Sequence, residues 1–549
     1  MRRPLLCLAL ALAATLLSAP AQAQYTSLMP PPEPPENLTT PEKVVLGKIL
    51  FYEEQLGSDN TVACGTCHIP GRSFTDDRPA QDIGKDGIPD TLDDVFGSFG
   101  LSNFDGNEDF DPVDDFILKP QITHRRTNDI FGALYADRIF WDGRAGDEFI
   151  DPETGLVSIP VGGALETQAL APLLSIIEQG HRFRTWDSIR TKLQDAVPMR
   201  LASDLTPDIV AALAVDPTYP DLFENAFGTT DINAERIAYA LAAYQRTLVP
   251  DQTPWDDYIN GNLNAMTPEQ VNGWNQFNGI ANCFKCHTPP LFSDNDFHNN
   301  GFRPWATDPG LMDTTGLNAD RGKFKTPSLR NAGLRTRFFH NGAFENMFPA
   351  GVSNIYWGGG GTFDDNLDPL IVPLRNIPGI NREHIFEFVE NALTDPRVRD
   401  ELPPFDRPTL LFEERPFGYN LYGQPTVGQQ GMTPLMAAQA PAMIGTNQEL
   451  KIGLARVPAG STAHLFGSTI RGFGQMRGGA AMYVKFPLII HEIVTAGGVG
   501  MRGFATVKLD IPNNLNLIGR KLYLQWVVED AGAPTGTSAT RGAEIEILP

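Results

Sequence analysis

The chain has 549 residues, 42% hydrophobic and 20% charged, so it is long enough for several folded domains and too apolar to be mostly disordered. Its 66 Asp and Glu residues outnumber its 43 Lys and Arg residues, which gives a formal net charge of -23 at pH 7. This charge argues against nucleic acid as a partner, because phosphate backbones attract basic surfaces. An acidic surface favours a basic partner instead.

The N-terminus has the pattern of a cleaved signal peptide over residues 1–23. Arg2 and Arg3 form a charged start, an apolar run extends from Leu5 to Leu17, and Ala21-Gln22-Ala23 is a small-residue cleavage site. The apolar run is too short for a permanent membrane anchor, and no later segment offers about 20 uninterrupted apolar residues. We therefore expect a periplasmic or secreted protein without a membrane span.

A proline-rich leader at residues 24–40 is expected to be extended, and helical patterns follow it. At Thr40-Pro41-Glu42 a capping hydroxyl, a proline and an acid mark a helix start. The apolar spacing after this point predicts one helical face. Further helical patterns occur at Leu173–Ile177, Ile232–Leu248 and Ile385–Leu393.

Two short motifs combine a pair of cysteines with a histidine: Cys64-Gly65-Thr66-Cys67-His68 and Cys283-Phe284-Lys285-Cys286-His287. Two cysteines at this spacing can each add to a vinyl group of one haem, and the following histidine then lies beneath the iron as its ligand. The motifs therefore predict two covalently bound c-type haems.

Zinc binding and thiol redox chemistry are the alternatives for such cysteines. Zinc needs four protein ligands at each site, and a redox Cys-x-x-Cys does not need a trailing histidine twice. Of the five cysteines, Cys7 falls in the signal peptide and the two motifs use the other four. None is left for a disulfide or a thiol nucleophile.

An acidic insertion follows the first motif, from Asp82 to Asp115. It opens with carboxylates at short intervals and a glycine for a sharp turn, which is similar to a calcium-binding loop. The candidate ligands are Asp82, Asp86, Asp90 and Asp93. A solvated acidic loop is the alternative.

The C-terminal part differs in character, because apolar and polar residues alternate there between Gly, Pro and Asn turns, as in Leu522–Val528. We predict two mainly α-helical c-type cytochrome domains followed by a C-terminal all-β, β-sandwich-like domain. The predicted ranges are 41–228 for the N-terminal haem domain, 229–405 for the C-terminal haem domain, 406–448 for a linker and 449–549 for the β domain.

Seven further segments, in the same order, resemble the bacterial di-haem cytochrome c peroxidase and MauG superfamily, and the resemblance spans about residues 40–405. These segments are Leu46-Gly47-Lys48-Ile49-Leu50-Phe51, Phe140-Trp141-Asp142-Gly143-Arg144, Glu166-Thr167-Gln168-Ala169, Glu178-Gln179-Gly180, Phe297-His298-Asn299-Asn300-Gly301, Lys325-Thr326-Pro327-Ser328-Leu329-Arg330-Asn331 and Phe339-His340-Asn341-Gly342.

The resemblance implies different roles for the two haems. The haem on His68 would react with hydrogen peroxide, with Glu178 as the acid–base group and Gln168 orienting the peroxide. Trp141 matches the tryptophan that the family places between its haems, where an indole can relay electrons. The non-catalytic alternatives are a surface carboxylate for Glu178 and an ordinary core residue for Trp141.

Two axial positions vary within the superfamily. Some peroxidases close the first haem with a histidine from a mobile loop, but His124 stands too near Trp141 in sequence to fit that pattern well. At the second haem, peroxidases use a methionine and MauG-like proteins a tyrosine. The expected offset from His340 falls close to Tyr356, which we predict as the ligand, with Met347 or no protein ligand as the alternatives.

The resemblance also implies a calcium ion between the haem domains, for which Asn128 is the candidate side chain. Arg335 and Arg337 replace the residues that usually surround the carbonyl donors, and this departure puts the site in doubt.

The leading interpretation is a di-haem oxidoreductase that uses hydrogen peroxide and shares oxidising equivalents between both haems. The partner would be a small cytochrome c or copper protein as electron donor, or a protein substrate whose side chain is oxidised. The alternative is a non-enzymatic periplasmic electron-transfer cytochrome, for which Glu178 and Gln168 would have no purpose. Di-haem oxygenases that cleave polymers also resemble the superfamily, but nothing in the sequence marks an apolar substrate tunnel.

Overall fold

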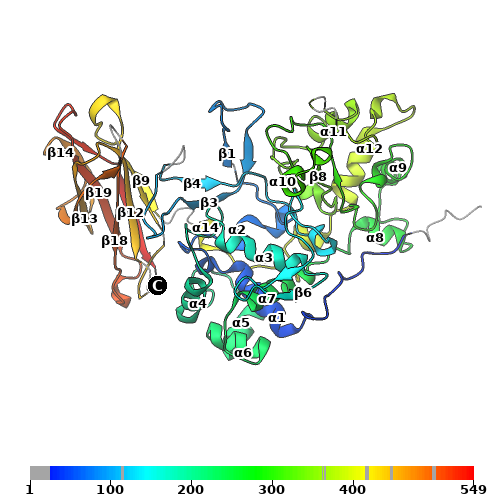
Figure 1. The fold of residues 1–549 in the computed structure, drawn as a ribbon, viewed down its shortest axis with the longest axis horizontal. Coiled ribbons are helices and arrows are strands. Elements are labelled where there is room, and N and C mark those ends of the chain that lie inside the picture. The colour runs from blue at the N-terminus through cyan, green and yellow to red at the C-terminus, as the bar shows by residue number, and fades with distance from the viewer. Residues whose placement is uncertain are drawn as a thin grey trace, which may run out of the picture.

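The computed structural model describes residues 25–78, 80–112, 117–361, 363, 366–414, 419–439, 441–445, 449–497 and 502–548. The signal peptide predicted at residues 1–23 lies outside these residues. A part rich in helices and loops lies beside a part made of strands (Figure 1). Within the described residues, no helix is long and apolar enough to cross a membrane.

The haem-domain region is mainly helical, and its strands are short. Its helices are α1 (Pro41–Tyr52), α2 (Cys64–Cys67), α3 (Ala164–Leu174), α4 (Trp186–Asp195), α5 (Pro207–Val215), α6 (Tyr219–Phe227), α7 (Ala234–Arg246), α8 (Pro254–Ile259), α9 (Pro268–Phe277), α10 (Met312–Thr315), α11 (Gly351–Gly358), α12 (Arg382–Glu387), α13 (Pro396–Arg399) and α14 (Leu411–Glu414). Its strands form pairs: β1 (Ala80–Asp82) with β2 (Val95–Gly97), β3 (Phe99–Ser102) with β4 (Pro120–Ile122), β5 (Phe149–Ile150) with β6 (Val157–Ile159), and β7 (Phe297–His298) with β8 (Phe324–Lys325).

Helix α1 begins where the sequence predicts, because the Thr40 hydroxyl accepts a hydrogen bond from the Lys43 amide. It packs against α7, and a Cβ at Gly47 would lie 1.9 Å from the Ala240 carbonyl oxygen. Glycine at this position is therefore what allows the two helices to approach. Lys48, on the same helix, is buried and forms ion pairs with Asp208 at 2.9 Å and with Asp406 at 3.0 Å.

The other helical patterns were only partly right. The pattern Ile232–Leu248 corresponds to α7, and Ile385–Leu393 corresponds to α12 followed by a π-helical turn at Phe388–Ala392. The pattern Leu173–Ile177 is wrong as a helix of its own, because α3 ends at Leu174 next to Pro172. Beyond this point the chain turns away as a loop, and that loop carries Glu178.

The two halves of the haem region have separate hydrophobic cores. One surrounds α1 and α7, and the other contains Trp255, Trp274, Phe292 and Phe388. The proline-rich leader, expected to be extended, has no helix or strand in its described part and joins the halves. The Tyr25 hydroxyl bonds to Asn278 in the second half, and the Asn37 amide bonds to Glu166 in the first.

The same local structure occurs once in each half. A bridge joins Ile139 to Ala145 in the first half, and a bridge joins Phe338 to Phe344 in the second. Each bridge closes a turn whose glycine, Gly143 or Gly342, adopts a positive φ. Trp141 and His340 occupy the equivalent position in the two turns, and their rings lie 6.4 Å apart. The two halves therefore meet at these turns.

The C-terminal part consists of two sheets around one hydrophobic core. One sheet has the order β10 (Leu435–Ala438), β12 (Leu450–Val457), β18 (Gly503–Leu509), β17 (Ala496–Gly497). The other has the order β11 (Ala442–Met443), β21 (Gly542–Leu548), β19 (Lys521–Glu529), β13 (Thr462–Ser468), β16 (Leu488–Val494), with β9 (Tyr419–Tyr422) on β21 and β20 (Thr537–Ala539) on β19. The hairpin β14 (Arg471–Arg477) and β15 (Ala480–Val484) is separate. Ile452, Leu465, Val507 and Trp526 from both sheets share the core.

Three of these strands, β9, β10 and β11, lie in the segment expected to be a linker. Strands β9 and β11 pair with β21, more than 90 residues further along the chain, whereas β10 pairs with the nearby β12. They complete the edges of both sheets.

The second half of the acidic insertion attaches the β domain to the first haem half. Phe104 and Phe110 pack against Ala437 and Ala455, and the Phe110 amide donates to the Thr506 hydroxyl at 2.9 Å. Lys451 forms an ion pair with Glu108 in the same segment. This part of the insertion is therefore a docking segment.

We predict that Phe110→Ala weakens this attachment. Phe110 is 2% exposed, and removal of a buried phenylalanine side chain costs about 3–5 kcal/mol. Differential scanning calorimetry should show the β-domain transition at a lower temperature. The matched control is Phe183→Ala, because Phe183 is 81% exposed and its removal should change stability by less than about 0.5 kcal/mol. Equal shifts for the two variants would contradict the docking role.

Candidate functional site

The first Cys-x-x-Cys-His motif borders a large internal cavity. Helix α2 carries Cys64 and Cys67, and both line a cavity of about 990 Å³ together with His68. The Nδ1 atom of His68 lies 2.9 Å from the carbonyl oxygen of Phe74. Since this carbonyl accepts the Nδ1 proton, the lone pair on Nε2 is free to bind a metal.

The second motif repeats this arrangement. A 3-10 turn at Cys283–Lys285 carries the thiols, and His287 Nδ1 lies 3.1 Å from the Phe292 carbonyl oxygen. Burial lowers the pKa of His287 to about 4 and also lowers the pKa of His68. Both imidazoles are therefore neutral, as a metal ligand must be.

The thiols themselves disfavour a zinc site. Burial raises the pKa of Cys64, Cys67 and Cys283 to about 12. A structural zinc ion is bound by thiolates, whereas thioether attachment to a haem leaves an uncharged sulfur. Neutral sulfurs beside an oriented histidine fit a haem at both positions.

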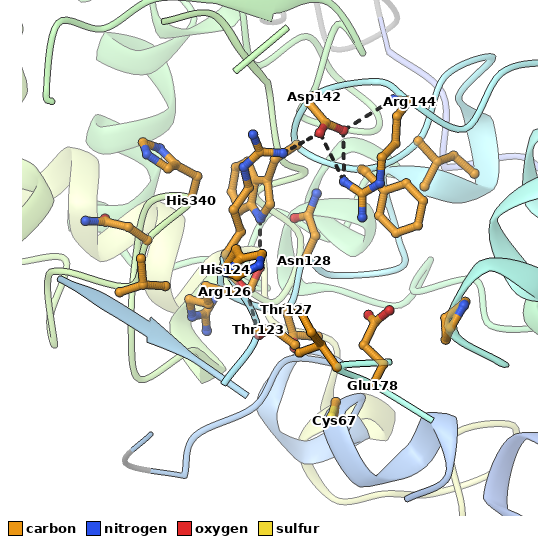
Figure 2. Close-up of a pocket in the computed structure, with 18 of the residues that line it drawn as sticks. Cys67, Thr123, His124, Arg126, Thr127, Asn128, Asp142, Arg144, Glu178 and His340 are labelled. Carbon is orange, nitrogen blue, oxygen red and sulfur yellow. Dashed lines mark hydrogen bonds and ion pairs between the residues drawn. The ribbon is translucent and has the colours of Figure 1, made fainter. Parts of the chain in front are cut away.

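Glu178 and Gln168 line the same cavity as the first motif. Gln168 lies on α3, and Glu178 follows in a tight loop in which the amides of Glu178, Gln179 and Gly180 all point to the Ser175 carbonyl oxygen. Figure 2 shows the carboxyl group of Glu178 on the same side of the cavity as Cys67. The structure therefore brings the predicted acid–base group and the first haem site together.

The environment of Glu178 changes its acidity. Burial raises the pKa of its carboxyl group, and a hydrogen bond with Ser175 and the nearby charge of Arg144 partly oppose this effect. A carboxyl group with a raised pKa can hold and release a proton closer to neutral pH than an exposed glutamate. His124 lines the cavity as well, with an exposed side chain.

Trp141 lies where the two haem halves meet. Its side chain is buried, and its indole Nε1 donates to the Arg126 carbonyl oxygen at 2.8 Å. Arg125, which precedes Arg126 in sequence, bonds to Asp142 in the turn of Trp141. It also forms an ion pair with Asp308 in the second half at 2.6 Å. These contacts fix the indole between the two halves.

Asn128 also lines the cavity, but its surroundings are cationic. Its side-chain oxygen accepts a hydrogen bond from the Asp129 amide, and Asp129 forms a buried ion pair with Arg335 at 3.0 Å. The neighbouring Arg126 is buried, and desolvation together with the charge of Arg335 lowers its pKa to about 9. A divalent cation beside these guanidinium groups would be repelled.

The carboxylates of the candidate calcium loop accept hydrogen bonds within the loop. Asp93 accepts from the amides of Lys85 and Asp86, and Asp82 accepts from the Gly84 amide. In the described part of the chain, one set of three metal-ligating side chains has its ligand atoms within 4.8 Å of one another, and it is Cys286, Asp294 and His298. The structure therefore does not gather Asp82, Asp86, Asp90 and Asp93 into a site. Cys286 is the thiol expected to bind the second haem.

Both candidates for the sixth ligand of the second haem lie near its motif. Tyr356, on α11, packs against the core that contains Cys283, and its hydroxyl bonds to Asn300. Burial and the proximity of Cys286 and Cys283 raise the pKa of Tyr356 to about 12. Met347 is buried in the same core. Both candidate ligands therefore lie in the core around the second motif.

Sequence reasoning missed two backbone carbonyls at the haem motifs and one buried ion pair. The carbonyls of Phe74 and Phe292 orient the histidines, and both phenylalanines adopt a positive φ. A phenylalanine soon after each motif was the available signal. Glu166, inside the segment that resembles the family, is a buried structural residue, because it bonds to Arg246 at 2.8 Å and holds α3 against α7.

Two oriented histidines, each beside a pair of cysteines, and a cavity that Glu178 and Gln168 line fit a haem-dependent oxidoreductase. Comparison with known proteins agrees with this class. The family model of the di-haem cytochrome c peroxidases matches residues 41–264. A cytochrome-c peroxidase from Pseudomonas sp. (strain SCT) is 26% identical over 443 residues, covering 74% of this chain and 94% of that protein.

Two further relatives represent both branches of the superfamily. The methylamine utilization protein MauG of Methylorubrum extorquens is 29% identical over 313 residues, covering 57% of this chain and 68% of MauG. The cytochrome c551 peroxidase of Nitrosomonas europaea is 27% identical over 344 residues, covering 60% of this chain and 80% of that enzyme. Residues 41–264 thus match the di-haem cytochrome c peroxidase family, and the relatives named cytochrome c peroxidase and MauG support a peroxidase-type oxidoreductase.

Replacing Cys64 and Cys67 by alanine should remove the covalent haem of the first site alone. Because the two motifs lie in separate cores, the second haem should remain attached. Intact-protein mass spectrometry after acid extraction of free haem should show two haems in the wild type and one in the variant. The reciprocal change of Cys283 and Cys286 serves as the control. Retention of both haems in either variant would contradict the assignment.

Proposed function

We propose that the protein reduces hydrogen peroxide at the haem site of His68 and takes up electrons through the haem site of His287. The observation that carries this proposal is that Glu178 faces the same cavity as Cys64, Cys67 and His68. When bound there, a haem supplies the redox chemistry of the reaction. The other steps depend on the side chains of this chain.

Reduction of one peroxide molecule to two waters consumes two electrons and two protons. Glu178 is placed to accept the proton of the near peroxide oxygen and to return it to the far oxygen as water leaves. Gln168, on α3 and ten residues earlier in the chain, supplies an amide that can orient the peroxide. A cytochrome that only transfers electrons would have no use for this pair.

Trp141 is the group best placed to pass electrons between the halves. Its indole is buried, it lines the cavity of the first site, and it contacts the turn of the second half through His340. The bond from its Nε1 to the Arg126 carbonyl holds the ring in one orientation. A fixed, polarisable ring at the junction of the halves suits a relay.

The identity of the protein ligand at the second haem site distinguishes two kinds of electron source. Methionine ligation by Met347 would raise the potential and suit a small cytochrome c or copper protein as donor. Phenolate ligation by Tyr356 would favour higher oxidation states and a protein substrate. We propose Tyr356 as the ligand, because it packs against the core that contains Cys283 and its hydroxyl is near enough to Cys286 and Cys283 for them to raise its pKa. A calcium ion at Asn128 or in the acidic loop forms no part of the proposed reaction.

We also propose that the protein is periplasmic or secreted. Covalent attachment of haem to Cys-x-x-Cys-His and a signal peptide at residues 1–23 belong together, because such proteins acquire their haems after export. The acidic haem region would attract a basic donor.

The variant Glu178→Gln should keep both haems and lose most peroxide reactivity. The amide cannot accept the peroxide proton, so we expect the rate of reaction with peroxide to fall by about 10²–10⁴-fold. Stopped-flow absorbance after peroxide addition measures this rate. Glu224→Gln is the matched control, because Glu224 is exposed on α6. An unchanged rate in Glu178→Gln would reject the acid–base role.

The pH dependence tests the same group. Burial raises the pKa of Glu178, so the basic form is present above this raised pKa and is lost as the pH falls through it. The peroxide rate of the wild type should therefore fall on acidification at a higher pH than an ordinary glutamate would cause. In Glu178→Gln this limb of the profile should be absent. Persistence of the limb in the variant would assign it to another group.

The variants Tyr356→Phe and Met347→Leu decide the sixth ligand of the second haem. If Tyr356 is the ligand, Tyr356→Phe should remove the phenolate-to-iron charge-transfer band and change the low-spin signal in spin resonance. Met347→Leu should leave both unchanged, because it preserves the packing volume. The opposite pattern would establish methionine ligation and a conventional peroxidase.

A further inference from the structure

An exposed apolar surface lies at the outer end of the β domain. It is formed by residues 470–494, that is, the hairpin β14–β15 and strand β16, here called the β14–β16 surface. Eight of the 33 exposed large apolar side chains in the described chain fall within these 25 residues. The most exposed are Phe473 at 83%, Phe486 at 73% and Leu488 at 71%. Such a concentration exceeds what folding of a soluble domain requires.

The segments of this surface are connected by hydrogen bonds. The Lys485 amide donates to the Ile470 carbonyl oxygen at 3.1 Å, and the Ser468 hydroxyl donates to the Lys485 carbonyl oxygen at 2.6 Å. Leu488 pairs with Gly467 at the start of β16. The base of the hairpin and the start of the strand therefore form one surface.

Strand β16 does not follow the usual alternation. In a strand with one buried face every second side chain is buried, whereas in Leu488–Val494 only Ile493 is partly buried. The apolar residues of β16 therefore contribute little to the core of the β domain. These exposed apolar side chains of β16 can therefore contact the surface of a partner.

The distribution of charge indicates which kind of partner the β14–β16 surface would bind. Residues 1–418 hold 33 Lys and Arg against 59 Asp and Glu, whereas residues 419–549 hold ten against seven. Between residues 467 and 497 there are three basic residues, Arg471, Arg477 and Lys485, and one acid, Glu492. The three basic side chains are exposed beside the apolar ones. The apolar groups are thus accompanied by positive charge in an otherwise acidic protein.

We propose that the β14–β16 surface docks the protein peripherally on an anionic lipid bilayer. Exposed phenylalanine and leucine side chains can enter the interfacial region, and lysine and arginine attract anionic headgroups. The surface lies at the end of the β domain away from the haem halves (Figure 1). Docking there leaves the cavity of the first site and the acidic haem region free for peroxide and for a basic partner.

Pairing with another protein strand is less compatible with this surface. Strand β16 is at the edge of its sheet, but its pairing with β13 is interrupted by a bulge between Leu465 and Phe466. A bulged strand bends and offers an irregular edge, which disfavours addition of a further strand. The lipid interface needs no such regular edge.

The test is co-sedimentation of the full-length holoprotein with vesicles. We expect binding to vesicles that contain phosphatidylglycerol, weak binding to vesicles of phosphatidylcholine alone, and weaker binding as salt is added. The double variant Phe473→Ser/Phe486→Ser should lower the partition coefficient by at least about tenfold, since it removes two inserting side chains. Arg477→Gln/Lys485→Gln should lower it about tenfold on anionic vesicles alone.

Phe183→Ser is the matched control, because Phe183 is 81% exposed but belongs to the haem region. It should bind vesicles like the wild type, and every variant should keep its circular dichroism and its peroxide reaction. Absence of binding to anionic vesicles would overturn the proposal. So would binding that all variants share, or a dimer in solution that Phe473→Ser/Phe486→Ser dissociates while vesicles bind nothing.

Discussion

The orientation of two histidine rings by backbone carbonyls is the interaction on which the molecule depends. In both halves the chain leaves the Cys-x-x-Cys-His motif, turns back, and presents a phenylalanine carbonyl to Nδ1 of the histidine. The turn requires a positive φ at Phe74 and at Phe292, a conformation that costs energy in a bulky residue. Both phenylalanine rings are fully buried, and this burial compensates for the strained backbone.

The repetition of this unit gives the two sites a common frame, and their differences lie on the opposite side of each haem position. In the first half the loop after α3 brings Glu178 to the cavity that Cys64, Cys67 and His68 line. In the second half α11 brings Tyr356 against the motif, within an aromatic core that also buries Met347. One frame therefore supports two sites with different surroundings, and the equivalent turns with Trp141 and His340 connect them.

The sequence predicted most of this frame because the haem chemistry needs particular residues at short spacing. The two motifs, the start of α1 at Thr40 and the helix α7 depend on neighbouring residues, so local patterns were sufficient. The loop of Glu178 was recognised through its resemblance to a family, since as a local pattern it looked like the end of a helix. The strands β9 and β11, which pair with β21, and the ion pair of Asp129 with Arg335 depend on partners far away in the sequence, so no local pattern predicts them.

The two halves of the acidic insertion make different contacts. Its first half carries the carboxylates that suggested calcium, yet they accept hydrogen bonds from amides of their own loop. Its second half lies between the β domain and the loop of the acid–base group: Phe110 packs on β12, while the amide of Leu101 donates to the Ile177 carbonyl oxygen at 3.0 Å.

A Cβ on Gly100 would lie 1.6 Å from the same carbonyl oxygen, so β3 and the loop of Glu178 are in direct backbone contact. The β domain thus supports the wall of the reactive cavity through the insertion, although it contributes no side chain to it. In physical terms, the insertion is the structural connection between the outer domain and the loop that carries Glu178.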